Sequence, residues 1–295
     1  MTNTATWRME TKIQKKLAVI NDLSGYGRCS LTVALPVVSA MGVQCCPVPT
    51  AILSNHTAYP AYFFDDYTEK LPAYIGKWKE MGFSFDGILT GFLGSAKQIE
   101  VVENFIQYFA PRPLGKKEAK SHPVKVIIDP IMGDHGRVYS TLTKELCDRM
   151  KSLAEKADLL TPNLTEACIL TDTPYRPHFT RKELEKLFDK LSTLCPGQIV
   201  LTGVDMGTYL ANLVFDPSSN KFLTLRKKRV AAERCGTGDI FSAVVAAGIL
   251  NDMPLKDAVL KAASFICLCL KETAGYDVSE SDGVVFEPFL NKLMQ

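Results

Sequence analysis

The 295-residue sequence has little excess charge and no long apolar run, and each shortage excludes a class of protein. Lysine and arginine total 34 against 32 acidic residues, without a long block of one sign, so the electrostatic footprint of a nucleic-acid-binding protein is missing. No apolar run reaches the roughly 18 residues that a membrane-spanning helix needs. We therefore expect a protein that acts on small molecules, with neither nucleic acid nor a membrane as a partner.

The sequence also lacks the cysteine and histidine spacings of disulfide-rich or zinc-binding proteins. Its nine cysteines are odd in number and include no Cys-x-x-Cys pair, and the histidines are scattered at positions 56, 122, 135 and 178. Residues 1–16 are polar and have no apolar segment of the signal-peptide kind. We therefore expect reduced thiols, buried mainly as small apolar side chains, in a cytoplasmic protein.

Two common nucleotide-binding motifs are absent as well. No Walker A lysine motif occurs, and Gly25 and Gly27 have no third glycine at position 30 to complete a dinucleotide fingerprint. A nicotinamide-dependent oxidoreductase is therefore disfavoured. No linker rich in glycine, proline or serine divides the chain, so we predict a mobile tail over residues 1–16 and a single domain over residues 17–295.

What is present is an alternation of short apolar runs and amphipathic segments of helical length. It predicts an α/β fold, with a mostly parallel central sheet and helices on both faces. The predicted strands are Leu17–Asn21, Gln44–Val48, Gly87–Thr90, Val124–Asp129, Leu159–Thr161 and Gln198–Thr202, followed by a hairpin of Tyr209–Val214 and Phe222–Arg226. The predicted helices are Leu31–Met41, Ala96–Phe109, Thr143–Ala154, Arg181–Leu194, Gly238–Leu250 and Leu255–Glu272.

The most distinctive local motif is Gly236-Thr237-Gly238-Asp239, which runs into a helix rich in alanine and valine. Glycines let the backbone approach a phosphate, and the free N–H groups and the helix dipole favour an anion there. An acid in the first helical turn would reach a hydroxyl held against a transferring phosphoryl group, so Asp239 is a candidate general base. The alternative is an ordinary helix start, where aspartate is favoured by the dipole alone.

Acidic and amide side chains also follow two of the predicted strands. Asp129 ends one strand, while Asn163 and Glu166 stand three residues apart just after another. Ligands of open α/β sheets bind at the carboxyl edge, where these groups could hold Mg²⁺ through waters beside nucleotide phosphates. Asn163 and Glu166 equally fit a helix capping box, and a lone strand-end aspartate is usually a turn former. The case for a site depends on convergence, with these two strand ends and the Gly-Thr-Gly-Asp turn all delivering acids to one edge.

Two polar segments near the first strands could contact a substrate. Asn21-Asp22-Leu23-Ser24-Gly25 follows the first strand as a small-residue turn, and Ser54-Asn55-His56-Thr57 follows the second. An ordinary strand-to-helix turn and a polar loop explain these segments about as well, and a lone histidine such as His56 is more often structural than catalytic.

Together these segments resemble the pyridoxal and pyridoxamine kinases of the ribokinase superfamily, from Leu17 to about Glu272. The family's motifs occur in order: the first-strand turn, Ser-Asn-His-Thr, Leu-Thr-Gly-Phe-Leu-Gly-Ser ending at position 95, Asp-Pro-Ile-Met-Gly-Asp from Asp129, Thr-Pro-Asn-Leu-Thr-Glu-Ala from Thr161, and Gly-Thr-Gly-Asp. The resemblance implies a ribokinase-like three-layer fold, ATP as phosphoryl donor, Mg²⁺, commonly a monovalent cation such as K⁺, and a homodimer.

The resemblance also implies roles for individual residues. Asp239 would deprotonate the 5'-hydroxyl of a B6 vitamer (pyridoxal, pyridoxamine or pyridoxine), and Gly236, Thr237 and Gly238 would form the anion hole for the moving phosphoryl group. The residues expected at the nucleotide are Asp129, Asp134, Asn163 and Glu166, with Tyr139 from a flap loop, Thr202, Thr237 and Gly238. Metal ions are expected at Asp129, Asn163 and Glu166, and the vitamin at Asp22, Ser24, Thr57 and Phe92.

Two departures from the family's pattern fall in the vitamin pocket. The first strand usually ends in Gln-Ser-His, whereas this chain has Asn21-Asp22-Leu23, and Phe92 stands where an aromatic hydroxyl is expected. We expect the acid at Asp22 to suit the aminomethyl group of pyridoxamine.

Two other functions are weighed against the B6 kinase. The stretch from Asp22 is similar to the Asp-x-Ser-Gly-Gly turn of hydroxymethylpyrimidine kinases, which often carry Gly-Thr-Gly-Cys, so Asp239 favours a pyridoxal kinase without excluding use of both substrates. A catalytically silent sensor of a nucleotide or vitamin would be expected to lose the base or the glycines, and both are present.

Overall fold

The computed structural model describes residues 13–112, 124–139, 142–217, 219, 221–230 and 234–294. The predicted mobile tail therefore lies mostly outside the described residues. Within these ranges no helix combines the length and the apolar character needed to cross a membrane.

The centre of the fold is a nine-stranded sheet with the strand order β11-β10-β9-β8-β5-β4-β1-β2-β3. Six neighbouring strands are parallel: β9, β8, β5, β4, β1 and β2. The other three, β3, β10 and β11, pair antiparallel. This confirms the predicted mostly parallel sheet. The strands are β1 (Lys16–Tyr26), β2 (Gln44–Asn55), β3 (Phe64–Asp66), β4 (Gly87–Thr90), β5 (Lys125–Ile128), β8 (Leu159–Leu160), β9 (Gln198–Met206), β10 (Tyr209–Asp216) and β11 (Lys221–Lys228).

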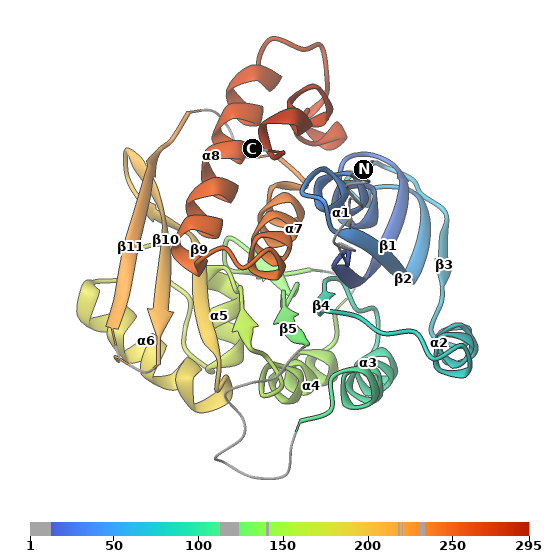
Figure 1. The fold of residues 1–295 in the computed structure, drawn as a ribbon. Helices are drawn as coiled ribbons and strands as arrows, with labels where there is room; N and C mark the ends of the chain where they lie inside the picture. The colour runs from blue at the N-terminus through green and yellow to red at the C-terminus, as the bar shows by residue number, and fades with distance from the viewer. Residues whose placement is uncertain are drawn as a thin grey trace, which may run out of the picture.

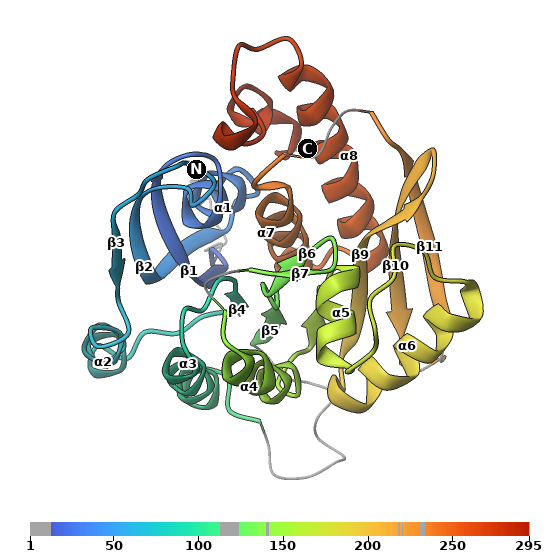
Figure 2. The same ribbon diagram turned by 180° about the vertical axis from the view of Figure 1, so that it is seen from behind.

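Helices cover both faces of the sheet and bury two separate apolar clusters against it (Figures 1 and 2). One face packs against α1 (Ser30–Ala40), α7 (Thr237–Leu250) and α8 (Leu255–Thr273). The other face packs against α2 (Leu71–Glu80), α3 (Ala96–Phe109), α4 (Lys144–Ala154), α5 (Leu164–Leu170) and α6 (Arg181–Leu194). Three layers result, as predicted.

The best-predicted helices carry clear start signals and a regular apolar face. The Ser95 side chain caps α3 by accepting the N–H of Gln98, and Thr180 with Glu183 forms a capping box on α6. The bounds of α3, α6 and β4 agree with those predicted from the sequence. Helix α2 was not predicted, because only Leu71 and Ile75 are buried and no regular apolar face marks it.

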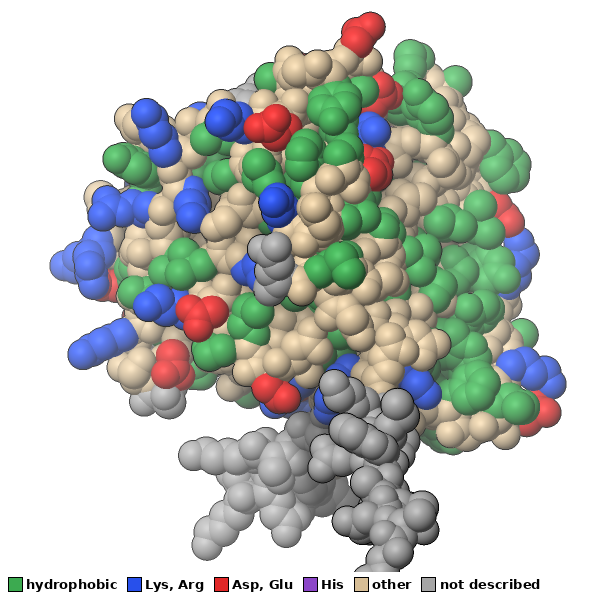
Figure 3. Space-filling view, turned by 45° about the horizontal axis from the view of Figure 1, so that its top comes forward, with side chains coloured by type: hydrophobic (Ala, Val, Ile, Leu, Met, Phe, Trp, Pro, Cys, Tyr) green, Lys and Arg blue, Asp and Glu red, His purple; other side chains and the backbone are tan. Residues whose placement is uncertain are grey.

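The first two strands run well past their predicted ends. β1 continues to Tyr26 after a register shift between Asn21 and Leu23, and it stays paired with β2 as far as Asn55. The first half of the Ser-Asn-His-Thr segment is therefore strand and not loop. With β3 these extensions form an arm that shows exposed apolar side chains, which gather on that side of the molecule in Figure 3. They are Tyr26, Ile52, Tyr62, Phe63 and Phe64.

Short elements complete the fold. A small hairpin of β6 (Gly133–Asp134) and β7 (Arg137–Val138) follows β5, and two 3₁₀ helices, η1 (Glu280–Asp282) and η2 (Glu287–Lys292), follow α8. The hairpin stands beside the N-terminus of α5, close to the carboxyl ends of the parallel strands (Figure 2). It therefore lies at the edge where the predicted site residues gather.

Candidate active site

The turn Gly236-Thr237-Gly238 lies at the start of α7. The fold requires a glycine at one of its two glycine positions but not at the other. Gly236 has φ = 82°, and a Cβ built there would lie 2.0 Å from the carbonyl oxygen of Arg28, so the fold itself requires a glycine. Gly238 is exposed, has an ordinary φ, and a Cβ there would meet nothing within 4 Å. No contact within the fold explains Gly238, which leaves its backbone open to an approaching ligand.

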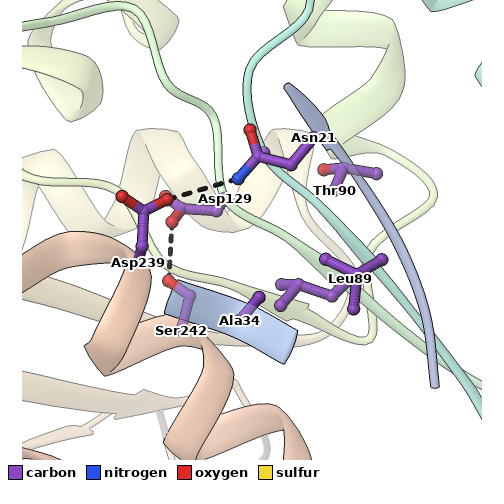
Figure 4. A pocket seen from close by; sticks show the side chains of 9 residues that line it. Asn21, Ala34, Leu89, Thr90, Asp129, Asp239 and Ser242 are labelled. Carbon is purple, nitrogen blue, oxygen red and sulfur yellow. Dashed lines mark hydrogen bonds between the residues drawn. The ribbon is translucent and has the colours of Figure 1, made fainter. Parts of the chain in front are cut away.

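Asp239 occupies the first turn of α7 and faces the carboxyl edge of the sheet. Its Oδ1 accepts a hydrogen bond from Asn21 Nδ2 at 3.2 Å, as Figure 4 shows. Loss of water around the carboxyl group raises the pKa of Asp239 to about 6, and the nearby Asp22 adds to the rise, while hydrogen bonds from the Ser30 N–H and from Asn21 oppose it. The residue keeps partial solvent exposure, so a substrate can reach it.

Asp129 directly follows β5 and lies beside α7. Its Oδ2 accepts a 2.6 Å hydrogen bond from Ser242 Oγ, one turn further along the helix than Asp239. The pKa of Asp129 is raised to about 7, chiefly by burial and also by the negative charge of Asp239, while the Ser242 hydroxyl opposes the rise. The two acids predicted from separate motifs are thus neighbours.

Asn163 and Glu166 form the capping box that was the alternative interpretation. Asn163 Oδ1 accepts the N–H of Glu166 at 3.0 Å, and Glu166 Oε2 accepts the N–H of Asn163 at 2.8 Å. The same side chains also reach the β6–β7 hairpin, because Asn163 Nδ2 donates to the Gly133 carbonyl and Glu166 Oε1 accepts the Met132 N–H. The capping box therefore holds the hairpin against the edge of the sheet, close to Asp129.

The remaining residues expected at a nucleotide surround this group. Asp134 lies in β6, and Tyr139 follows β7 with its N–H bonded to the Met132 carbonyl at 3.0 Å. Burial raises the pKa of Tyr139, and Glu166 and Asp134 are the acids that raise it most. Thr202, in β9, pairs with Asn163 through an isolated parallel bridge. The hairpin residues and Thr202 therefore lie around the Asn163–Glu166 capping box.

The acids at this edge suit a cation. Burial raises the pKa of Glu166, as does the charge of Asp129, and neither acid has a lysine or arginine partner in the described part of the chain. Buried carboxylates without a basic partner are stabilised by a metal ion. No three His, Cys, Asp or Glu side chains among the described residues are grouped closely enough to chelate a metal directly. The arrangement fits Mg²⁺ held partly through its waters.

Two of the residues expected at the vitamin, Asp22 and Ser24, lie at the register shift in β1. Asp22 is buried, and its two oxygens accept hydrogen bonds from Ser24 Oγ at 2.9 Å and Ser30 Oγ at 2.5 Å. Burial raises the pKa of Asp22. Phe92 is half-buried after β4, whereas Thr57 is exposed in the connection between β2 and β3. Ser24 is therefore engaged with Asp22, and the open positions are Phe92 and Thr57.

Four residues at this edge were given no individual role from the sequence. Ser242 carried a signal that could have been used, because it follows Asp239 by three residues and so shares its helix face. Ser30, in the left-handed region with φ = 52°, joins Asp22 to Asp239 and carries no such signal. Thr90 Oγ1 is, among the described residues, the one buried side-chain oxygen without a hydrogen-bond partner, and it faces the hollow lined by Asp129 and Asp239 (Figure 4). The fourth, Asn21, was expected only as part of a turn that could contact a substrate, and the structure shows that it bonds to Asp239.

The fold and sequence match known kinases. A Bacteroides thetaiotaomicron protein assigned to the phosphomethylpyrimidine kinases, in a crystal form with pyridoxal, is 36% identical, with a TM-score of 0.88 and coverage of 96% of each chain. The pyridoxine/pyridoxal/pyridoxamine kinase of Bordetella avium is 29% identical over 86% of this chain and 84% of its own length. The chloroplastic thiamine biosynthetic bifunctional enzyme of Arabidopsis thaliana is 26% identical over 89% of this chain, which spans 49% of that enzyme.

The match to the family as a whole is equally extensive. The model of the phosphomethylpyrimidine kinase family matches residues 34–285, which include every strand of the parallel sheet except β1 and the whole Gly-Thr-Gly-Asp turn. The three-layer arrangement is the one found in solved pyridoxal kinases, so the expected ribokinase-like fold is confirmed. The chain belongs to the phosphomethylpyrimidine kinase family, which it shares with pyridoxal kinases of ribokinase-like fold, and it is an ATP-dependent kinase.

Proposed function

We propose that this kinase transfers the γ-phosphoryl group of ATP to the 5'-hydroxyl of a B6 vitamer, which would serve the salvage of pyridoxal 5'-phosphate. The observation that carries the proposal is the pairing of Asp239 with the open backbone of Gly238 at the start of α7. A base and an anion-binding helix start then lie side by side, which is what transfer of a phosphoryl group to a hydroxyl requires.

In this proposal Asp239 accepts the proton of the attacking hydroxyl. A general base works best when its pKa lies near the working pH, and burial brings the pKa of Asp239 to about 6. The carboxylate is ionised at neutral pH and still basic enough to take a proton in the transition state. Asn21 and the Ser30 N–H hold the carboxylate in place without neutralising it.

The start of α7 would receive the charge that develops on the transferring group. The first N–H groups of a helix have no carbonyl partner within it, which here leaves those of Thr237 and Gly238 for a ligand, and the dipole of the 14-residue α7 adds positive potential at that end. Gly236 lets the chain turn into the helix, and Gly238 keeps side-chain atoms away from the phosphoryl oxygens. We assign Gly236, Thr237 and Gly238 to this anion hole.

The second acid group would serve the nucleotide and its metal. The chemistry that Mg²⁺ would supply there is to offset the negative charge of the nucleotide phosphates. Asp129, Asn163 and Glu166 would hold it, mainly through waters, with Asp134, Tyr139 and Thr202 around the phosphates. A monovalent cation such as K⁺ is part of the proposal, but no residue is assigned to it.

We assign the vitamin to the region around Asp22, Ser24, Thr57 and Phe92. The Asp22 carboxylate already accepts two serine hydroxyls, so an aminomethyl group of pyridoxamine would share or displace one of those hydrogen bonds. Phe92 offers an apolar ring surface beside Asn21, to which its N–H is bonded. The support for a B6 substrate is the similarity to B6 kinases such as that of Bordetella avium, together with the presence of pyridoxal in a crystal form of the 36% identical protein assigned to the phosphomethylpyrimidine kinases.

We further propose a homodimer in the cytoplasm. The arm of β1, β2 and β3 exposes Tyr26, Tyr62 and Phe63, an apolar surface of the kind that a second copy covers (Figure 3). All nine cysteines are free thiols, which suits a reducing compartment.

Hydroxymethylpyrimidine, or its phosphate, is the second candidate substrate. The matching family model bears the phosphomethylpyrimidine kinase name, and one relative is a thiamine biosynthetic enzyme. The substrates share a six-membered nitrogen ring with a hydroxymethyl group, so the same base and anion hole could serve both.

A coupled ATP assay across pyridoxal, pyridoxamine, pyridoxine and hydroxymethylpyrimidine tests the proposal. We expect kcat/KM to be at least about tenfold higher for a B6 vitamer than for hydroxymethylpyrimidine, a difference of about 1.4 kcal/mol. The reverse ranking would establish the thiamine precursor as the substrate. Binding of ATP and vitamer without turnover would instead indicate a catalytically silent sensor.

A further inference from the structure

Asn21 makes three hydrogen bonds that join separate parts of the site. Its Oδ1 accepts the backbone N–H of Phe92 at 2.8 Å and that of Asp22 at 3.0 Å, and its Nδ2 donates to Asp239 Oδ1 at 3.2 Å. The side chain is 5% exposed and lies where the strictly paired part of β1 ends. One amide therefore connects the base, the first-strand turn and the segment that carries Phe92.

The orientation of this amide is fixed by chemistry. Two N–H groups point at Oδ1, and only an oxygen can accept them, so the nitrogen must face Asp239. A flipped amide would set a donor against two donors and an acceptor against a carboxylate. Asn21 is thus held by the backbone as a donor aimed at one oxygen of Asp239.

The Asn21 side chain fits only because residue 91 is a glycine. A Cβ built on Gly91 would lie 2.4 Å from both Cγ and Nδ2 of Asn21. No side chain larger than glycine fits there while Asn21 keeps its place. Gly91 is therefore part of the arrangement that aims Asn21 at Asp239.

We propose that Asn21 is a positioning residue for the general base: its amide fixes the Asp239 carboxylate in the orientation that receives the substrate proton. The inference rests on the proposed role of Asp239. Asn21 does not itself take a proton, and it acts by restricting rotation of the carboxylate and by hydrogen bonding to its charged form. The competing explanation is that Asn21 only ties β1 to the Phe92 segment through its two accepted bonds.

Asn21→Asp separates these explanations, because aspartate keeps an oxygen for the N–H groups of Phe92 and Asp22 but offers Asp239 no donor when ionised. Asn21→Ala removes all three bonds. If Asn21 positions the base, both variants lose about 10- to 100-fold in kcat, the worth of one hydrogen bond to a charged group, with KM for ATP and vitamer changed less than about threefold. If Asn21 only links β1 to the Phe92 segment, the new carboxylate raises the pKa of Asp239 and moves the acidic limb of the pH profile upward, but Asn21→Asp retains the parental kcat at high pH, where Asp239 is ionised.

A double-mutant cycle with Asp239→Ala completes the test. Once the carboxylate is gone, Asn21→Asp should reduce single-turnover phosphorylation by less than about twofold, since it has nothing left to position. If Asn21→Asp lowers the rate of the Asp239→Ala variant by the same factor as that of the parent, the inference is overturned. Asn251→Asp is the matched control, because Asn251 donates in the same way to the Met41 carbonyl at 2.8 Å, at the far end of α7.

The outcome also distinguishes failure of this inference from failure of the proposed function. A parental chain without turnover, or an Asp239→Asn variant with full turnover, would remove the base itself. An active parent, an impaired Asp239→Asn variant and an unimpaired Asn21→Asp variant would remove only the positioning role.

Discussion

Ser242 Oγ donates a 2.6 Å hydrogen bond to Asp129 Oδ2, and both side chains are buried. This bond joins α7 to the end of β5, across 113 residues of chain. It holds an acid assigned to the metal and nucleotide next to the helix that carries the base. The Ser242 hydroxyl therefore links the acid assigned to the nucleotide with the helix that carries the proposed base.

Removal of the Ser242 hydroxyl should lower the stability of the protein and raise its requirement for Mg²⁺. Ser242→Ala leaves a buried carboxylate without its donor, which we expect to lower the free energy of unfolding by about 1–3 kcal/mol and to raise the Mg²⁺ concentration needed for half-maximal turnover. Urea unfolding and a Mg²⁺ titration measure the two effects. Ser264→Ala, which removes an exposed hydroxyl bonded within α8, should change neither. Unchanged stability of Ser242→Ala would contradict the buried hydrogen bond.

The two glycines of the turn should respond differently to alanine. Gly238→Ala meets no atom within 4 Å, so we expect parental thermal stability together with a loss of about tenfold or more in kcat, because the new methyl group stands at the anion hole. Gly236→Ala collides with the Arg28 carbonyl and forces a positive φ, so it should lose stability as well. Melting temperatures and initial rates of both variants check this. Full activity of Gly238→Ala would remove its backbone from the proposed phosphate site.

The activity should depend on pH through the base. The pKa of Asp239 is raised to about 6 from 3.8, so the ionised form needed for catalysis is lost as the pH falls through about 6. We expect kcat/KM to fall along an acidic limb near that value. An acidic limb near pH 4, the ordinary range for aspartate, would contradict a desolvated base.

The same pKa shift has the opposite sign for stability. Between pH 3.8 and about 6 the folded state keeps a proton on Asp239 that the unfolded chain has released, so this residue's contribution to stability decreases as the pH rises through that window. Asp239→Asn should therefore be more stable than the parent at pH 8 and lose that advantage below about pH 4. Urea unfolding at both pH values measures the difference. A destabilised variant at pH 8 would indicate that the folded state favours the charged carboxylate.

The acid at position 22 should influence the choice of vitamer. Asp22→Ser removes a buried negative charge that could face an aminomethyl group, so we expect the kcat/KM ratio of pyridoxamine to pyridoxal to fall by about threefold or more. Steady-state kinetics with all three vitamers measures the ratio. Identical ratios for parent and variant would remove Asp22 from substrate discrimination, and Asp22 would then serve only to hold Ser24 and Ser30.

Local sequence patterns were sufficient for much of the fold. β4, α3 and α6 have the predicted bounds because a short apolar run or a capped, regularly spaced apolar face marks each of them. The extension of β1 and β2 and the short β3 were not predicted, because strand pairing beyond the sheet edge depends on partners far along the chain. Helix α2 was missed because little of it is buried.

The candidate site was likewise predicted only in part: its main acidic residues were found from the sequence, but most of their contacts were not. Motifs located Asp239, Asp129, Asn163 and Glu166, and the structure brings these four to one edge. The capping box of Asn163 and Glu166 is local and was foreseen as an alternative, whereas the contacts that reach Asp239 and Asp129 were not predictable because they join residues distant in the sequence: Asn21 and Asp239 are separated by 218 positions. A sequence motif names the chemical groups, and only the assembled sheet determines which of them touch.

The most direct measurement is the turnover of the parent chain and of Asp239→Asn in a coupled ATP assay with pyridoxal. Asparagine keeps the size of the side chain and its acceptor for Asn21 but cannot take a proton. We predict parental phosphorylation at the 5' position and a kcat about 10²- to 10⁴-fold lower in the variant, which should remain folded by circular dichroism. A folded Asp239→Asn variant with near-parental turnover would contradict the account.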